Sequence, residues 1–244
     1  MKNFRFFITK EDLRDDRIII GGELCHKIKK VLRYKKGDEI TLLESNKIKY
    51  FGKVARIGEQ NIEIEILREE TVTAREIFTT LYLSIIKSQK FEIAIQKATE
   101  LGVNKIVPLM TTRSVVRIDE KSRAKKLNRW VAIATEAAAQ SKRDDIPEIT
   151  EIISVDELLH HDDDATIKIV CDERGGAPLK DYLDSAMLPL CISAAVGPEG
   201  GFTDNEMLVM SSAGFEPVLL SNNILRAETV PLFLMSAIQY EFGL

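Results

Sequence analysis

The segment LCISAAVGPEGGFTDNE, residues 190–206, decides the fold class of this 244-residue chain. Its first seven residues form an uncharged apolar run, typical of a strand that is buried on both faces of a parallel sheet. Three glycines follow within the next five residues. Thr203 and Glu206 then match the capping box, in which two side chains satisfy free backbone donors at a helix start. A buried strand, a glycine loop and a capped helix in this order predict one unit of a parallel α/β sheet.

Further strands and helices alternate from Phe78 onward. Short apolar runs predict buried strands, and apolar residues at helical spacing predict helices over 91–101 and 120–141. The strands are predicted at 79–86, 105–109, 167–171, 190–196 and 215–219. Pro108 is expected to close the second strand, and Pro231 suits the first turn of a last helix. This alternation favours an α/β domain built on a parallel sheet.

The first 72 residues have a different pattern, of short strands separated by turns. The strands are predicted at 4–8, 17–20, 39–43, 47–57 and 61–67. Residues 62–66 read IEIEI, a strict alternation that predicts one buried and one solvated face. Strands of this length and spacing predict a small antiparallel barrel. A polar stretch without apolar period follows at 68–75, and we place a domain boundary there, between residues 1–72 and residues 73–244.

Composition excludes several classes of protein. The hydrophobic fraction of 45% and the charged fraction of 30% are those of an ordinary globular protein. The longest uncharged run has 14 residues, at 185–198, whereas a membrane-spanning helix needs about 20. The three cysteines are never spaced as CxxC, so neither a disulfide framework nor a metal site is expected. The sequence thus predicts a cytoplasmic protein without a membrane segment or a metal.

Three loops are expected to meet at one edge of the predicted sheet, because each follows a buried strand. In a parallel sheet, loops at the carboxyl ends of the strands form the ligand crevice. The loops read VGPEGGF at 196–202, SNNILRAET at 221–229 and CDERGG at 171–176. Glycines let a backbone approach a ligand closely, although a tight structural turn would also use them. The glycine loop has neither GxGxxG spacing nor a following GK[ST], so a dinucleotide or triphosphate site is disfavoured.

Arg226 is the candidate catalytic residue, in the second of these loops. A planar guanidinium at the crevice could bind a phosphate or stabilise a developing oxyanion. The alternative is a surface arginine that pairs with Glu228. No Ser-His-Asp order, paired-carboxylate motif or metal-ligand spacing accompanies it.

A basic cluster lies in the first domain, at residues 26–36. It holds six Lys or Arg residues in eleven positions and no acid, although the whole chain has a net charge of −4. Like charges this close together repel one another, and binding of a polyanion would relieve that repulsion. The cluster therefore favours RNA contact, and the alternative is a solvated helix face. The residues that would extend the patch are Arg113, Arg117, Lys142 and Arg143. Tyr34 and Phe51 are candidates either for base stacking or for the core.

These motifs together resemble the RsmE family of 16S rRNA (uracil-N3)-methyltransferases, over nearly the full length of the chain. The matching segments are RFF at 5–7, HKIKKVLR at 26–33, QKATELGV at 96–103, RSV at 113–115, EAAAQSKR at 136–143, VGPEGGF at 196–202 and ILRAET at 224–229. The family belongs to the SPOUT methyltransferases. The resemblance therefore implies a PUA-like β-barrel in residues 1–72 and an α/β domain with a parallel sheet and a deep trefoil knot in residues 73–244. It also implies a homodimer.

The resemblance further implies S-adenosylmethionine as the cofactor, held in a bent form by the loops of the knot. The implied cofactor-binding residues are Cys171, Gly197, Pro198, Glu199, Gly200, Gly201, Leu219, Leu220, Ile224, Leu225 and Arg226. The implied substrate is N3 of uridine 1498 in the 16S rRNA of the small ribosomal subunit. The RNA-binding residues would be Arg5, Lys29, Lys30, Arg33, Arg113, Lys142 and Arg143. Arg226 would stabilise charge on the uracil or hold the nucleotide's phosphate, and no general base is identifiable.

Two other functions stay open from the sequence. One is a SPOUT enzyme with another target, such as a ribose 2′-hydroxyl. The related ribose methylases carry Asn-Val-Ser where Ile224-Leu225-Arg226 stands here. The other is a non-catalytic RNA-binding module, which has no need of three loops around a crevice. The final loop reads SNN where Gly-Pro often precedes the triplet, but asparagine can adopt glycine-like backbone angles, so cofactor binding is still expected.

Overall fold

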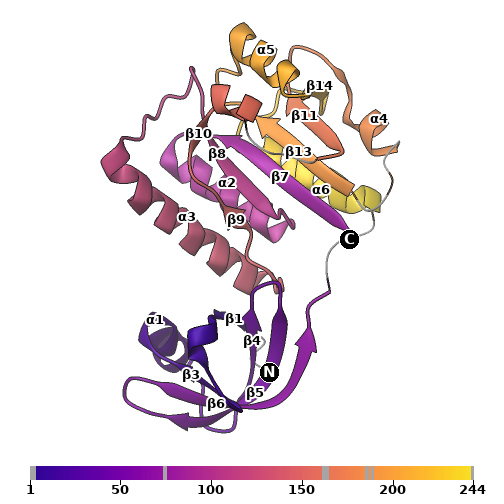
Figure 1. Cartoon of the computed structure of the whole chain (residues 1–244). Helices are drawn as coiled ribbons and strands as arrows, with labels where there is room; N and C mark the ends of the chain where they lie inside the picture. The colour runs from indigo at the N-terminus through magenta and orange to yellow at the C-terminus, as the bar shows by residue number, and fades with distance from the viewer. Residues whose placement is uncertain (1–3, 74–75, 161–164, 185–186, 188–189, 243–244) are drawn as a thin grey trace. The chain divides into compact units, whose positions relative to one another are not determined.

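Figure 1 shows the computed structural model of the chain, which describes residues 4–73, 76–160, 165–184, 187 and 190–242. The chain divides into two compact units. The first comprises residues 1–74 and 138–146, and the second comprises residues 75–137 and 147–244. The boundary between residues 72 and 73 stays a proposal, and no sequence pattern predicts that residues 138–146 group with the first unit.

The first unit is built on a six-stranded sheet. Its strands lie in the order β1 (Arg5–Ile8), β4 (Glu39–Glu44), β5 (Ile48–Ile57), β6 (Ile62–Thr71), β3 (Arg17–Ile20) and β2 (Leu13–Arg14). Its short helical segments are η1 (Lys10–Asp12), α1 (Gly22–His26) and η2 (Lys27–Val31). The prediction of purely antiparallel pairing is wrong for β1 and β4, which run parallel. A long connection separates these two strands in the chain, and it lets the second strand return in the same direction as the first.

Strand β6 is longer than the sequence predicts. Its first half alternates as expected, with Ile62 and Ile64 fully buried. Residues 68–71 were assigned to a polar boundary segment, but they pair with residues 48–51 of β5 and continue the strand. All four are exposed. A strand segment that buries neither face shows no apolar alternation, which explains why the pattern missed it.

The second unit is built on a parallel sheet, as predicted. The strand order is β10 (Ile153–Ser154), β8 (Lys105–Met110), β7 (Ile77–Ser84), β13 (Leu190–Val196), β11 (Ile167–Cys171), β14 (Glu216–Leu219) and β12 (Ala177–Pro178). The short strand β9 (Glu148–Ile149) also pairs with β8. Every pair is parallel. The α/β fold class is therefore confirmed for this unit.

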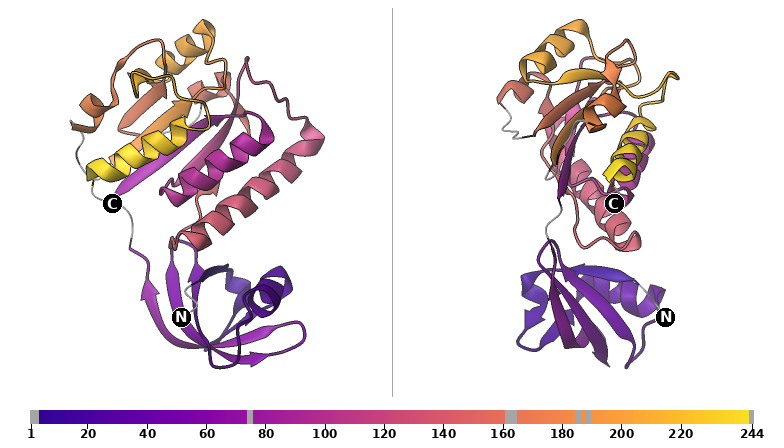
Figure 2. Two further views of the ribbon diagram at one scale, coloured as in Figure 1. Left: turned by 180° about the vertical axis from the view of Figure 1, so that it is seen from behind. Right: turned by 90° about the vertical axis from the view of Figure 1, so that its right-hand side faces the viewer.

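Helices cover both faces of this sheet, which explains the continuous apolar runs of its strands. The helices are α2 (Ser88–Glu100), α3 (Glu120–Gln140), α4 (Leu179–Asp184), α5 (Asp204–Ser212), α6 (Val230–Phe242) and the short η3 (Asp156–His160). Leu81 and Leu83 of β7 face a core shared with α2, α3, α4 and α6, whereas Tyr82 faces a core shared with α5 and η3. Figure 2 shows α2 and α6 together on one side of the sheet and α5 on the other.

Pro108 does not close its strand, contrary to expectation. Strand β8 continues through it to Met110. On the outer side of β8, β9 pairs with residues 105–106 and β10 pairs with residues 109–110. Pro108 falls in the gap between these two short strands, where a missing backbone N–H interrupts no ladder.

Within the described residues, no helix is long and apolar enough to cross a membrane. Part of the uncharged run at 185–198 lies outside those residues. The described part of the chain also contains no group of three or more His, Cys, Asp or Glu side chains that could hold a metal ion.

Candidate functional site

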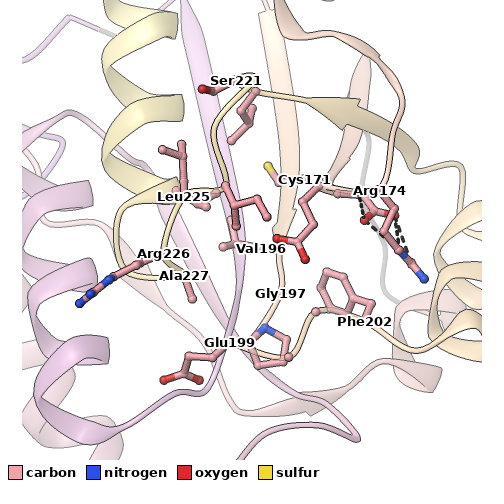
Figure 3. A pocket seen from close by; sticks show the side chains of 18 of the residues that line it. Cys171, Arg174, Val196, Gly197, Glu199, Phe202, Ser221, Leu225, Arg226 and Ala227 are labelled. Atoms are coloured by element: carbon pink, nitrogen blue, oxygen red, sulfur yellow. Dashed lines mark hydrogen bonds and ion pairs between the residues drawn. The ribbon is translucent and has the colours of Figure 1, made fainter.

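A cavity of about 420 Å³ lies where the loops after β11, β13 and β14 meet (Figure 3). These strands are neighbours in the parallel sheet, so their carboxyl ends share one edge. All of the predicted cofactor-binding residues line the cavity: Cys171, Gly197, Pro198, Glu199, Gly200, Gly201, Leu219, Leu220, Ile224, Leu225 and Arg226. The three loops that the sequence singled out thus enclose one cavity.

The glycine loop turns sharply between β13 and α5. The amide of Gly201 donates to the carbonyl of Pro198 at 2.9 Å, and Gly201 has a φ of +65°, which favours glycine. A Cβ added at Gly197 would lie 3.2 Å from the ring of Phe202. A Cβ at Gly201 would meet nothing within 4 Å, so the backbone angle alone explains that glycine within the described chain. The loop is therefore both a tight turn and a wall of the cavity.

Arg113 anchors the glycine loop from the segment that follows β8. Its Nη1 donates to the carbonyl oxygens of Gly200 at 2.8 Å and Phe202 at 3.3 Å. Arg113 also lines the cavity. The sequence predicts an RNA contact for Arg113. In the structure, its guanidinium donates to the backbone of the glycine loop instead.

Glu206 ties the same two segments together. Its buried carboxylate accepts hydrogen bonds from the backbone amides of Thr112 and Thr203, both at 2.7 Å, and from the Thr203 hydroxyl at 2.9 Å. The predicted capping box of Thr203 and Glu206 is confirmed. Burial alone would raise the pKa of Glu206, but the hydrogen bonds from Thr203 and Thr112 lower the pKa below its ordinary value. A charged carboxylate therefore fixes the end of the glycine loop.

Arg226 lies exposed in the loop between β14 and α6, and Figure 3 shows its side chain pointing away from Cys171 and Phe202. Its guanidinium has no hydrogen-bond partner within the part of the chain that the structure describes. Glu228, the partner in the alternative interpretation, accepts instead from Nζ of Lys90, at 3.0 Å to Oε1 and 3.2 Å to Oε2. This geometry disfavours a surface arginine that Glu228 holds.

The loop after β11 is fixed by Arg174. Its Nε lies 3.0 Å from Oδ1 and 3.1 Å from Oδ2 of Asp172, and its Nη1 donates to Asp204 at 2.8 Å. Asp204 is the first residue of α5, so Arg174 links this loop to the helix that follows the glycine loop. Burial raises the pKa of the Cys171 thiol to about 12, so the thiol stays neutral and offers a polarisable, weakly polar surface.

The sequence did not assign the remaining charged residues that line the cavity, which are Lys90, Asp172, Glu173 and Arg174. The loop that carries the last three was singled out, but without roles for them. Lys90 lies far from every motif. The one available signal was its place near the start of a predicted helix, where the helix dipole disfavours a cation.

The predicted RNA-binding residues of the first unit lie in different settings. Lys30, Arg33 and Lys142 are exposed. Lys29 donates to the carbonyl of Gly58 at 2.6 Å, and Arg5 pairs with Asp144. Exposed cations can meet a polyanion, and Lys29 and Arg5 also hold parts of their own unit.

Arg143 does not fit an RNA-binding role. Its side chain is only 5% exposed and is held by the buried carboxylate of Asp145, with an Nη2–Oδ2 distance of 2.5 Å. We therefore remove Arg143 from the RNA-binding proposal. Of the two aromatic candidates, Tyr34 is buried in the core of the first unit, and Phe51 is half-buried beneath the guanidinium of Arg68.

Comparison with known proteins identifies the family. Residues 73–239 match the model of an RNA methyltransferase domain, and residues 22–67 match that of an RNA methyltransferase PUA domain. The ribosomal RNA small subunit methyltransferase E of Bacillus subtilis is 32% identical over 97% of this chain and 96% of that protein. The chain belongs to the ribosomal RNA small subunit methyltransferase E family. The resemblance that the motifs indicated is confirmed, and so is the PUA-like character of the first unit.

Solved structures of methyltransferases share the fold. The ribosomal RNA small subunit methyltransferase E of Neisseria gonorrhoeae, bound to S-adenosyl methionine, is 30% identical, with a TM-score of 0.86 over 97% of both chains. A methyltransferase of Legionella pneumophila, in complex with the bound cofactor SAM, is 26% identical, with a TM-score of 0.88 over 98% of both chains. Both alignments include the two units of this chain.

Proposed function

We propose that this protein transfers a methyl group from S-adenosylmethionine to N3 of uridine 1498 in 16S rRNA. The observation that carries the proposal is the cavity of about 420 Å³ at the ends of β11, β13 and β14, with the exposed Arg226 in its lining. Membership of the family supports the class of reaction, and relatives that bind SAM support the cofactor. The target atom and position rest on the motif resemblance.

The residues around the cavity fit this cofactor. The glycine loop offers backbone donors and acceptors without the Lys-Ser/Thr pair that a triphosphate needs, and the cofactor carries no phosphate. Apolar side chains suited to an adenine ring come from Leu219, Leu220, Ile224 and Leu225. The lining holds the carboxylates of Asp172, Glu173 and Glu199 together with four cationic side chains, so it offers partners for both the cationic and the anionic groups of this cofactor. When bound, the cofactor supplies an electrophilic methyl group on a sulfonium.

Arg226 has the chemistry that the nucleobase requires. N3 of uracil carries a proton at neutral pH, so the proton must leave as N3 takes the methyl group, and negative charge then spreads to O2 and O4. The guanidinium presents a planar fork of donors and has no competing hydrogen bond within the described residues. N3 lies on the pairing edge, so the base must be unpaired or flipped out to reach this residue.

We further propose an RNA contact through Lys30, Arg33 and Lys142, and a homodimer that uses α6. The exposed aromatic side chains of that helix are Phe233, at 40% exposure, and Tyr240, at 88%. Sedimentation at micromolar concentration should give about twice the monomer mass of 27.5 kDa. The deep trefoil knot in the path of residues 73–244 also stays a proposal.

The decisive experiment incubates the protein and S-adenosylmethionine with 16S rRNA, free and in small subunits, that lacks the modification. Mass mapping of the product should locate one new methyl group on the uracil of nucleotide 1498. A methyl group on a ribose would refute the nucleobase assignment, and RNA binding without methylation would refute enzymatic function. Arg226→Ala should lower the single-turnover rate at saturating RNA and cofactor by about 10²–10³.

A further inference from the structure

Lys90 connects two of the loops that enclose the cavity. It lies in the first turn of α2, and its Nζ is 3.0 Å from Oε1 of Glu228 and 3.8 Å from Oε1 of Glu199. Glu228 belongs to the loop that carries Arg226, and Glu199 belongs to the glycine loop. One ammonium group therefore bridges both loops beside the proposed catalytic cation.

Helix stability does not account for a lysine at this position. The first turn of a helix favours Asp or Glu and disfavours cations, and the first turn of α2 contains no acid. The Lys90 side chain is 33% exposed, so it is not a core residue either. The contacts of Lys90 with the carboxylates of Glu228 and Glu199 therefore explain why a lysine stands at this position.

Glu228 is a potential competitor for Arg226. Burial alone would raise the pKa of Glu228, but a backbone hydrogen bond, the bond from Lys90 and the charges of Lys90 and Arg226 lower the pKa, so the group is ionised at neutral pH. A carboxylate is a preferred partner for the planar guanidinium fork. In the structure, Lys90 occupies both oxygens of Glu228, at 3.0 and 3.2 Å, and the guanidinium of Arg226 has no hydrogen-bond partner among the described residues.

We propose that Lys90 is a positioning residue, which holds Glu228 away from Arg226 and so keeps the guanidinium free to meet the nucleobase. The role of Arg226 toward the nucleobase rests on the proposed function. The claim that Lys90 keeps Glu228 from pairing with Arg226 does not. Without Lys90, the group of four charges formed with Glu199, Glu228 and Arg226 loses its neutrality. Glu228 then turns to Arg226, the cation two residues before it in the chain.

The first test measures Arg226 directly and needs neither RNA nor cofactor. Phenylglyoxal modifies arginine side chains that are free, and mass spectrometry of peptides gives the rate at Arg226. Lys90→Met, which keeps side-chain length and helix propensity, should slow this modification about fivefold, the scale of a partly exposed ion pair. Lys90→Arg should leave the rate within about twofold of wild type, since it retains the cation.

Second-site variants distinguish an exchange of ion-pair partners from a general effect of net charge on the modification rate of Arg226. Two double variants are compared, Lys90→Met with Glu228→Gln and Lys90→Met with Glu199→Gln. Each removes one positive and one negative charge. The first pair should restore the modification rate of Arg226, because the competing carboxylate is gone, and the second should not. Each glutamine variant is also measured alone to close the double-mutant cycle.

The single-turnover methylation rate at saturating RNA and cofactor should follow the same order across these variants. The inference is overturned if Lys90→Met leaves the modification rate within about twofold of wild type, or if both double variants recover equally. Thermal unfolding of each variant shows whether it is folded. A wild-type protein that methylates no uracil would refute the proposed function, while the modification series would still decide the role of Lys90.

Discussion

Glu206→Ala should strongly destabilise the second unit, because it removes a buried carboxylate from the first turn of α5. The carboxylate of Glu206 is 5% exposed and accepts three hydrogen bonds, two at 2.7 Å and one at 2.9 Å. A hydrogen bond to a charged group contributes about 1.5–3 kcal/mol, and part of that is recovered where water reaches the exposed Thr112. We therefore expect a loss of about 3–4 kcal/mol. Glu206→Gln keeps one acceptor oxygen and should lose about half as much.

The chain contains a matched control for this measurement. Glu157 makes the same local contacts, with the Ser154 amide at 2.6 Å and the Ser154 hydroxyl at 2.8 Å, but its side chain is exposed. Glu157→Ala should therefore cost about 1 kcal/mol or less, as capping contacts at the surface do. Urea unfolding followed by circular dichroism gives both values. A Glu206→Ala variant no less stable than Glu157→Ala would show that burial and the third bond to Thr112 contribute nothing.

The pH dependence gives the same carboxylate a second signature. The hydrogen bonds lower the pKa of Glu206 in the folded protein, although burial opposes them. A group with a lowered folded pKa stabilises the protein fully above its unfolded pKa, which is about 4.3 for Glu. That stabilisation is lost as the pH falls through the folded pKa. The difference in unfolding free energy between wild type and Glu206→Gln should thus be constant near neutrality and shrink in acid; a difference that grows in acid would refute the assignment.

Three other predictions follow from single contacts. A Cβ at Gly176 would lie 2.3 Å from a backbone oxygen of β14, whereas one at Gly175, which also has positive φ, would meet nothing within 4 Å. Gly176→Ala should therefore lower the free energy of unfolding by about 1–3 kcal/mol more than Gly175→Ala, and equal losses would contradict the clash. Lys30→Ala with Arg33→Ala should reduce the slope of log K against log salt for RNA by about 0.7–0.9 per lost phosphate contact, and an unchanged slope would indicate a merely solvated face. Arg143→Ala should leave that slope unchanged but cost about 3–5 kcal/mol in unfolding, because it removes the cation that faces the buried carboxylate of Asp145.

Sequence reasoning located the cavity because the rules it used are topological. Apolar runs alternating with helical patterns require parallel strands, and the carboxyl ends of neighbouring parallel strands must share an edge. The three loops after 167–171, 190–196 and 215–219 could therefore be assigned to one crevice without any side-chain geometry. The capping box of Thr203 and Glu206 was predictable for a similar reason, since it depends on a spacing of three residues.

Contacts and burial that depend on the tertiary fold could not be predicted, whether the partners are near or far apart in the chain. Arg143 was assigned to RNA on its charge, and only the fold reveals that Asp145 holds it in a buried pair. Lys90 meets Glu228 across 138 residues, and no spacing rule connects them. The parallel pairing of β1 and β4 and the passage of β8 through Pro108 likewise depend on which strands arrive as neighbours.

Long cationic side chains help to position the walls of the cavity. Arg113 holds the glycine loop, Arg174 holds the loop after β11, and Lys90 holds the final loop. Partly exposed ion pairs such as those of Arg174 and Lys90 contribute at most about 1 kcal/mol each, so their loops belong to the weakly held part of the unit, while the sheet beneath them stays buried. A site that must admit both a cofactor and a nucleotide needs walls that can move in this way. Removing one of these anchors should consequently change ligand affinity and the rate of methyl transfer more than the unfolding temperature. Glu206 differs, because its buried carboxylate both holds the glycine loop and stabilises the unit.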